Sequence, residues 1–288
     1  MHTTANGNEV TAVAVPGGAL AVELIGSGPE PVLVIHGISS QRKLWNWLHA
    51  VAPGLALVAP DLRGRGDSAA VTGPSSVSRH AADMIAVLDA LGLRSVHVCG
   101  MSMGGFVAVE LAVSFPGRVK SLILVDGGFP MAVPAGLTPE SLPAVFADRL
   151  TRLGRDWPDV TDYAGFFVAQ TAPLLDPSDP LLLDYLRHDL AGRRVRLSGA
   201  GLSADAADIF FGFSKWQQLT VPVRLITAEW STGRDSAPAY PPAAVAAVRA
   251  QLGPLVTVRP APETDHASSI MTIGGAAVAS AEITRALA

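Results

Sequence analysis

The sequence predicts an α/β protein with a mostly parallel eight-stranded sheet that is flanked by helices and carries a helical cap inserted after the sixth strand. Short apolar segments alternate with helical patterns, and several of these segments are apolar throughout, which is typical of strands buried on both faces. The alternation stops after Asp126 and resumes near Pro222. We therefore expect a core of residues 1–129 and 219–288 and a cap of residues 130–218.

Composition narrows the class of protein. The 288 residues are 49% hydrophobic and 16% charged, with a formal net charge of −4. These values are typical of a dense globular protein. No basic patch indicates nucleic acid, no apolar run is long enough for a membrane span, and the first residues do not form a secretion signal. We expect a cytoplasmic monomer or homodimer that binds neither nucleic acid nor membrane.

The elements are predicted from apolar periodicity and from the Pro and Gly residues that interrupt it. The first two strands flank a glycine-rich hairpin turn, and all eight cover 10–15, 20–25, 31–35, 55–59, 95–98, 121–125, 222–228 and 255–258. Core helices are expected over 42–51, over 76–91, from Ser102 to Phe115, over 243–252 and over 278–287. Cap helices are expected over 140–153, 160–170, 180–190 and 203–213.

The pattern Gly-x-Ser-x-Gly occupies residues 100–104, between a strand pattern and a helix pattern. This is the context of a nucleophile elbow, in which a strained turn exposes a serine hydroxyl. Gly100 and Gly104 supply the small neighbours that a close strand and helix need. We expect Ser102 to be a nucleophile and the Met103 N–H to face a developing oxyanion. The alternative is a glycine-rich turn with an incidental serine.

Further motifs follow predicted strands in a characteristic order. They are His36-Gly37, the polar glycine-rich turn 61–68, the serine turn, the helical insertion and Asp265-His266. Over nearly the whole chain, this order resembles the α/β-hydrolase superfamily, in particular its capped esterase, lactonase and haloperoxidase-like branch. The resemblance implies a serine hydrolase, and we interpret the polar turn 61–68 and Asp265 as structural.

A serine nucleophile needs a base that titrates near neutrality, which is the role of histidine. Only His266 follows the last predicted strand, after the nucleophile and in a loop, and it is the expected base. The remaining histidines are better explained as surface or hydrogen-bonded structural groups: His2, His36, His49, His80, His97 and His188. The resemblance implies an oxyanion hole formed by the backbone N–H groups of Ile38 and Met103.

The acid that orients the base is less clear from the sequence. The family usually places it a few residues after the seventh strand, where this chain has Ser231, which cannot serve. Asp126 follows the sixth strand, where a minority of the family, including lactonases that open resorcylic macrolides, carry the acid. Glu229 and Asp235 are alternatives, and Asp126 could simply begin a turn. We favour Asp126.

The cap is expected to determine specificity with aromatic and methionine side chains. The predicted pocket residues are His36, Met101, Phe129, Met131, Trp157, Phe166, Phe167, Trp216 and Met271. Because no Lys or Arg cluster is aimed at the site, we expect a neutral, fairly hydrophobic ester or lactone as substrate. We expect no metal and no cofactor. Alternatives are a cofactor-free perhydrolase or a C–C bond hydrolase with the same residues, or a ligand receptor with slow turnover.

Overall fold

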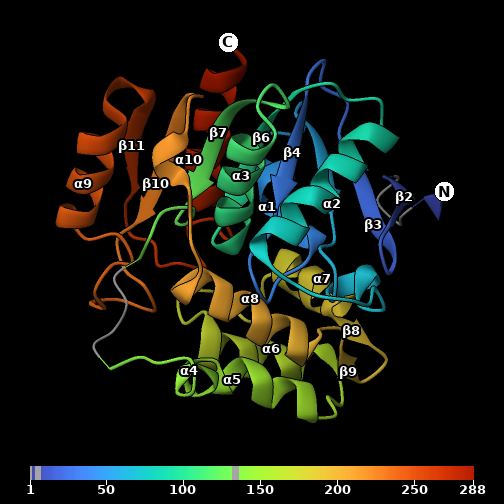
Figure 1. The fold of residues 1–288 in the computed structure, drawn as a ribbon. Coiled ribbons are helices and arrows are strands. Elements are labelled where there is room, and N and C mark those ends of the chain that lie inside the picture. The colour runs from blue at the N-terminus through green and yellow to red at the C-terminus, as the bar shows by residue number, and fades with distance from the viewer. Residues whose placement is uncertain (1, 4–7, 132–135) are drawn as a thin grey trace.

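The computed structural model describes residues 2–3, 8–131 and 136–288 (Figure 1). Within these residues, nine strands form one sheet in the order β1-β2-β3-β5-β4-β6-β7-β10-β11. Their bounds are β1 (His2–Thr3), β2 (Glu9–Val15), β3 (Gly18–Ile25), β4 (Pro31–Ile35), β5 (Ala56–Pro60), β6 (Val96–Met101), β7 (Val119–Val125), β10 (Val223–Ala228) and β11 (Val256–Ala261). The predicted α/β-hydrolase fold with eight main strands is confirmed.

Two small features differ from the prediction. The two-residue strand β1 pairs antiparallel with β2 and precedes the first predicted strand, at residues 10–15. A second small sheet joins β8 (Leu190–Ala191) and β9 (Arg194–Val195) in the inserted segment. Strands of two residues carry no periodicity, so the sequence pattern gives no signal for them.

The sheet brings the ends of distant chain segments together at one edge. β2, β3 and β5 pair antiparallel, whereas the pairs from β5 to β11 are parallel. Ile35 is in register with Gly100, Met101 with Val125, and Val125 with Ile226. The residues that follow β4, β6, β7 and β10 therefore meet at the carboxyl edge, where ligands of such sheets bind.

Helices cover both faces of the sheet. α2 (Val77–Ala90), α3 (Met103–Ser114) and α9 (Pro242–Leu252) pack on one face, and α1 (Asn46–Val51) and α10 (Ile273–Leu287) pack on the other. The predicted helix 42–51 is divided into the 3₁₀ helix η1 (Arg42–Trp45) and α1. Alternate strand residues face opposite clusters, as Val98 and Cys99 do, so the strands are apolar throughout.

The segment between β7 and β10 forms a helical layer below the carboxyl edge of the sheet in Figure 1. It contains α4 (Leu142–Val145), α5 (Ala147–Thr151), η3 (Arg152–Gly154), α6 (Val160–Thr171), α7 (Pro180–Asp189), α8 (Gly199–Phe211) and η4 (Trp216–Gln218). We call it the cap, and its exact division from the core at residues 130 and 218 stays a prediction.

The cap shares a hydrophobic cluster with the core. Trp157, Tyr163 and Tyr185 of the cap are buried in the same cluster as Trp47 of α1. Burial of apolar surface between the two layers stabilises their contact. No helix in the described part of the chain has the length and apolar character needed to cross a membrane.

Candidate active site

Ser102 lies at the junction of β6 and α3, in a conformation that L-residues rarely adopt, with φ of 54°. Glycines permit this junction because the chain segments nearly touch. A Cβ on Gly104 would lie 1.9 Å from Ile35 O, and one on Gly100 would lie 2.3 Å from Gly104 O. Strain at an overdetermined turn is typical of functional sites.

A continuous hydrogen-bonded relay joins three of the predicted site residues. Ser102 Oγ lies 2.9 Å from His266 Nε2, and His266 Nδ1 lies 2.6 Å from Asp126 Oδ2. A carboxylate only accepts hydrogen bonds, so Nδ1 carries the proton and Nε2 is free to accept one from the serine hydroxyl. This is the arrangement that a general base needs.

Asp126 is held firmly at the end of β7. Its carboxyl group is fully buried, and its backbone N–H donates to Ile226 O at 2.8 Å. Its second carboxylate oxygen accepts from Ala228 N at 3.1 Å. Asp126 also has a positive φ of 44°, and from the end of this strand its carboxylate reaches the base.

The structure does not bring the two alternative acids to His266. Glu229 is exposed, and its carboxylate accepts from Glu263 N at 2.8 Å. Asp235 is exposed as well. Asp265 is buried and accepts from Gly233 N at 2.9 Å, so it shapes the loop, in agreement with the structural interpretation.

The turn of residues 36–40 lies beside the nucleophile, since a Cβ on Gly37 would be 3.3 Å from Ser102 Cβ. His36 Nε2 accepts from Leu62 N at 3.0 Å, so the protonated Nδ1 donates to Gly37 O at 2.8 Å. Burial lowers the pKa of His36 to about 4, which keeps this tautomer neutral. Gly37 C=O and Ile38 N–H belong to one trans peptide plane and point in opposite directions.

A cavity of about 550 Å³ opens over Ser102 and His266 between the core and the cap. Both predicted oxyanion residues, Ile38 and Met103, line it, together with four of the predicted pocket residues. These four are Met101, Met131, Phe167 and Met271. Their backbone or side chains can therefore contact a bound ligand.

Five predicted pocket residues lie outside this cavity, so that part of the prediction is wrong. His36 is buried below the turn, and Phe129 packs edge-on against Trp216 with a ring separation of 5.4 Å. The rings of Trp157 and Phe166 pack against each other inside the cap at a tilt of 53°, with their centroids 5.0 Å apart. These rings form cores instead, because aromatic residues bury large areas and pack with one another.

The lining residues that the sequence did not indicate come mainly from the cap and from the loop after β10. They include Leu44, Phe106, Phe146, Thr171, Tyr185, Ile209, Phe210, Thr232 and Pro238. Tyr185 shows why they were missed: its ring is buried in the cap cluster while its hydroxyl donates to Ser40 Oγ at 3.1 Å. Only the tertiary packing of cap on core brings such residues to the cavity.

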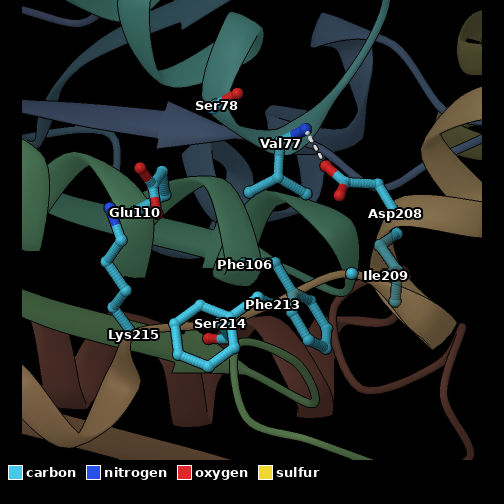
Figure 2. Close-up of a pocket in the computed structure, with 10 residues that line it drawn as sticks. Val77, Ser78, Phe106, Glu110, Asp208, Ile209, Phe213, Ser214 and Lys215 are labelled. Atoms are coloured by element: carbon cyan, nitrogen blue, oxygen red, sulfur yellow. Dashed lines mark hydrogen bonds between the residues drawn. The ribbon is translucent and has the colours of Figure 1, made fainter.

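A second cavity, of about 300 Å³, lies between α2, α3 and α8 (Figure 2). Phe106 and Ile209 line both cavities and form a shared wall. Asp208 accepts from Val77 N at 2.7 Å, and Phe213 is 85% exposed at the rim. Because neither Ser102 nor His266 lines it, we place the candidate chemistry in the larger cavity.

One cluster in the described part of the chain has metal-ligating side chains, namely Asp61, Asp67 and His188. Arg42 already pairs with both carboxylates, at 2.7 Å for Asp67. Burial alone would raise the pKa of Asp61, but the His188 hydrogen bond and the Arg42 charge hold it well below its usual value. The cluster is explained as an ion-pair network between core and cap, and we assign no metal to it.

Comparisons with known proteins agree with this architecture. Residues 30–158 match the family model described as the alpha/beta hydrolase fold. The crystal structure of E-2-(acetamidomethylene)succinate hydrolase aligns with a TM-score of 0.78 over 97% of this chain and 99% of that chain, at 20% identity. The chain therefore has the α/β-hydrolase fold. The fold prediction is confirmed by both comparisons.

The proteins that are similar to this chain in sequence have different names. An uncharacterized protein of Mycobacterium bovis is 40% identical over 109 residues, which are 38% of this chain and 32% of that protein. A putative 2-succinyl-6-hydroxy-2,4-cyclohexadiene-1-carboxylate synthase of Bacillus subtilis is 28% identical over 214 residues, which are 70% of this chain and 73% of that protein. The match thus spans about a third of the mycobacterial relative. Because these relatives have different names, they do not assign an activity to this chain.

Proposed function

We propose that this protein is a serine hydrolase that cleaves a carboxylic ester or lactone of a neutral, fairly hydrophobic small molecule. The relay from Ser102 through His266 to Asp126, opening into an apolar cavity, is the observation that carries the proposal. The base lies within hydrogen-bond reach of both the nucleophile and the acid, which is the geometric requirement for acyl transfer.

The first half of the proposed reaction forms an acyl-enzyme. Ser102 Oγ attacks the carbonyl carbon while His266 Nε2 takes the hydroxyl proton, and the carbonyl oxygen becomes an oxyanion. The N–H groups of Ile38 and Met103 would donate to this oxyanion. His266 then gives its proton to the alkoxide leaving group as the C–O bond breaks.

The second half releases the product acid. A water molecule attacks the acyl carbon, and His266 takes its proton. As the tetrahedral intermediate collapses, the proton returns to Ser102 and the free acid leaves. Asp126 keeps the imidazole in the required tautomer and stabilises its positive charge during both halves. Every proton in this scheme moves between protein groups, substrate and water.

The substrate class follows from the lining of the cavity. Among the described lining residues there is no Lys, Arg, Asp or Glu, and most side chains are apolar or hydroxyl-bearing. A charged substrate would lose its hydration without gaining a partner, which costs free energy. A volume of about 550 Å³ is in the range of small-molecule sites.

Covalent labelling tests the proposal directly. The protein should react with a fluorophosphonate probe and hydrolyse p-nitrophenyl esters, and Ser102→Ala should abolish both. Ser231→Ala is the matched control: Ser231 lines the same cavity, its hydroxyl donates to Ser236 Oγ, and it contacts His266 only through its backbone carbonyl, which the substitution keeps, so labelling should stay intact. A panel of neutral and charged esters and of macrocyclic lactones then defines the class. A preference for charged short-chain esters would contradict the proposed specificity.

Two alternatives predict other outcomes of the same experiment. Labelling without turnover would favour a ligand receptor, whereas turnover of peroxide or of β-diketone substrates in place of esters would favour a perhydrolase or a C–C bond hydrolase. The receptor alternative is based on Ser231, which stands where the acid is usually found. The Asp126–His266 contact supports an active triad instead, because Asp126 supplies an acid to the base.

A further inference from the structure

Two buried arginines bind consecutive carbonyl groups of the 36–40 turn. Arg65 Nε donates to Ile38 O at 3.0 Å, and Arg152 Nη2 donates to Ser39 O at 2.7 Å. Both arginine side chains are almost completely buried. His36 binds the preceding carbonyl group, Gly37 O, so side chains hold three successive peptide planes of this turn.

Each arginine is paired with a carboxylate of the cap. Arg65, in the core, has its Nη2 2.6 Å from Asp205 Oδ2 on α8. Arg152, in the cap, donates to Tyr163 OH at 3.0 Å and lies 3.6 Å from Asp189, which accepts from the tyrosine hydroxyl. The turn is therefore connected to the cap at two independent points.

These connections depend on the position of the cap. A buried guanidinium without its carboxylate is an uncompensated charge, so Arg65 is stable at Ile38 O only while α8 supplies Asp205. His80 also donates to this carboxylate, at 3.0 Å. Arg152 moves with the cap itself, so Ser39 O loses this donor when the cap lifts.

We propose that Arg65 and Arg152 are positioning residues that make the aim of the Ile38 N–H depend on a seated cap. The inference rests on the proposed function, in which this N–H stabilises the oxyanion. When the cap is displaced, His36 still holds the Gly37–Ile38 plane, but the next two planes lose their side-chain donors. A hydrogen bond made to the transition state acts on kcat more than on KM.

A neighbouring ion pair provides a matched control. Arg63 and Asp83 are buried to a similar degree and lie 2.8 Å apart. The Arg63 guanidinium donates to Thr72 O and Pro16 O, and these core acceptors are not part of the 36–40 turn. Removing this pair shows how much stability and kcat change when a buried ion pair of the 61–68 turn is lost without a direct change at the 36–40 turn.

The experiment compares Arg65→Lys, Asp205→Asn and Asp83→Asn with the wild type, at a temperature where circular dichroism shows all to be folded. The readouts are kcat and KM for a p-nitrophenyl ester and the inhibition constant of a trifluoromethyl ketone, whose serine adduct carries an oxyanion. For Arg65→Lys and Asp205→Asn we expect kcat to fall about tenfold, below the 10²–10³-fold cost of losing a whole donor. KM should stay within about twofold, and ketone affinity should fall with kcat. Asp83→Asn should lower only the unfolding temperature.

Folded Arg65→Lys and Asp205→Asn proteins with wild-type kcat and ketone affinity would overturn the inference. If Arg65→Lys does not fold, Tyr163→Phe decides, because it removes only the hydroxyl between Arg152 and Asp189. A parallel loss of kcat and ketone affinity in Tyr163→Phe supports the inference, and unchanged values overturn it. A wild type that neither labels nor hydrolyses esters would overturn the proposed function and this inference together.

Discussion

The relay and the 36–40 turn both adjoin Ser102, but they are built differently. Asp126 and His266 follow strands β7 and β11, and their relay contacts involve only core residues. The 36–40 turn also follows a core strand, but its carbonyl groups are bound by Arg65 and Arg152, which pair with the cap.

This difference separates two parts of the proposed chemistry. The ends of the strands place the nucleophile and the acid, and the hydrogen bonds that join nucleophile, base and acid are made by core side chains. The turn that carries the proposed oxyanion donor is instead held by side chains from both the core and the cap. A substrate that seats the cap would complete the stabilisation of its own transition state, which is a physical route to specificity through kcat.

The largest expected effect comes from breaking the core side of this comparison. Asp126→Asn keeps the size of the side chain and the oxygen that accepts from Ala228 N, and Asn tolerates a positive φ. Its amide cannot hold the required tautomer of His266. We expect kcat for a p-nitrophenyl ester to fall about 10⁴-fold with the fold intact. Near-normal turnover would contradict the assignment and return the role to Glu229 or Asp235.

The next effect concerns the stability of the turn at acid pH. The pKa of His36 is lowered by burial from 6.5 to about 4, so below pH 6.5 the unfolded chain binds a proton that the folded chain excludes. Stability is therefore unaffected by this group above pH 6.5 and is lost as the pH falls towards 4. From pH 7 to pH 5 we expect it to contribute a loss of about 2 kcal/mol.

Urea unfolding of the wild type and of His36→Gln at both pH values measures this contribution. Glutamine can accept from Leu62 N but does not titrate, so its unfolding free energy should fall less on acidification, by about the same 2 kcal/mol. All other titrating groups, including the buried His80, are common to both proteins and cancel in the difference. Parallel pH profiles would show that His36 is protonated in the folded state.

The same two regions show what could be predicted from the sequence. Ser102, His266 and Asp126 each follow a strand, and strands buried on both faces are recognisable from continuous apolar runs. The place of Asp126 after the sixth strand favours it over Glu229 in the sequence, and the structure adds the contact between its carboxylate and His266 Nδ1. The local sequence does not determine where this carboxylate points; the position of β7 in the sheet does.

The cap side was less predictable because its contacts join residues far apart in the chain. Phe129 and Trp157 are aromatic, as many pocket residues are. In the structure, however, Phe129 packs on Trp216 and Trp157 packs on Phe166. The Arg65–Asp205 pair spans 140 positions in the sequence and has no local pattern. We interpreted the 61–68 turn as structural, and the structure adds that its second arginine binds the carbonyl of Ile38.

A smaller effect is expected from a substitution that displaces the 36–40 turn. A Cβ on Gly37 would lie 3.2 Å from Met101 Sδ and 3.3 Å from Ser102 Cβ, so Gly37→Ala should move the turn slightly away from the nucleophile. We expect about a tenfold loss of kcat, less than removal of a donor would cause. Gly165→Ala, which has open space on α6, is the matched control and should not alter kcat. Equal activity of the two variants would mean that the turn does not contact the reacting group.

The smallest effect should come from the two carboxylates that compete with Asp126 in the sequence. Glu229→Gln and Asp235→Asn change exposed side chains of the loop after β10, and neither group is hydrogen-bonded to His266 in the described structure. Each variant should keep kcat and KM within about twofold, because exposed charges are screened by water. Measured beside Asp126→Asn on one ester, they test whether the acid acts through its contact with His266 or merely through negative charge near the loop. A tenfold loss in either variant would mean that the charge of the loop supports the imidazolium, and the relay would then no longer be confined to the strand ends.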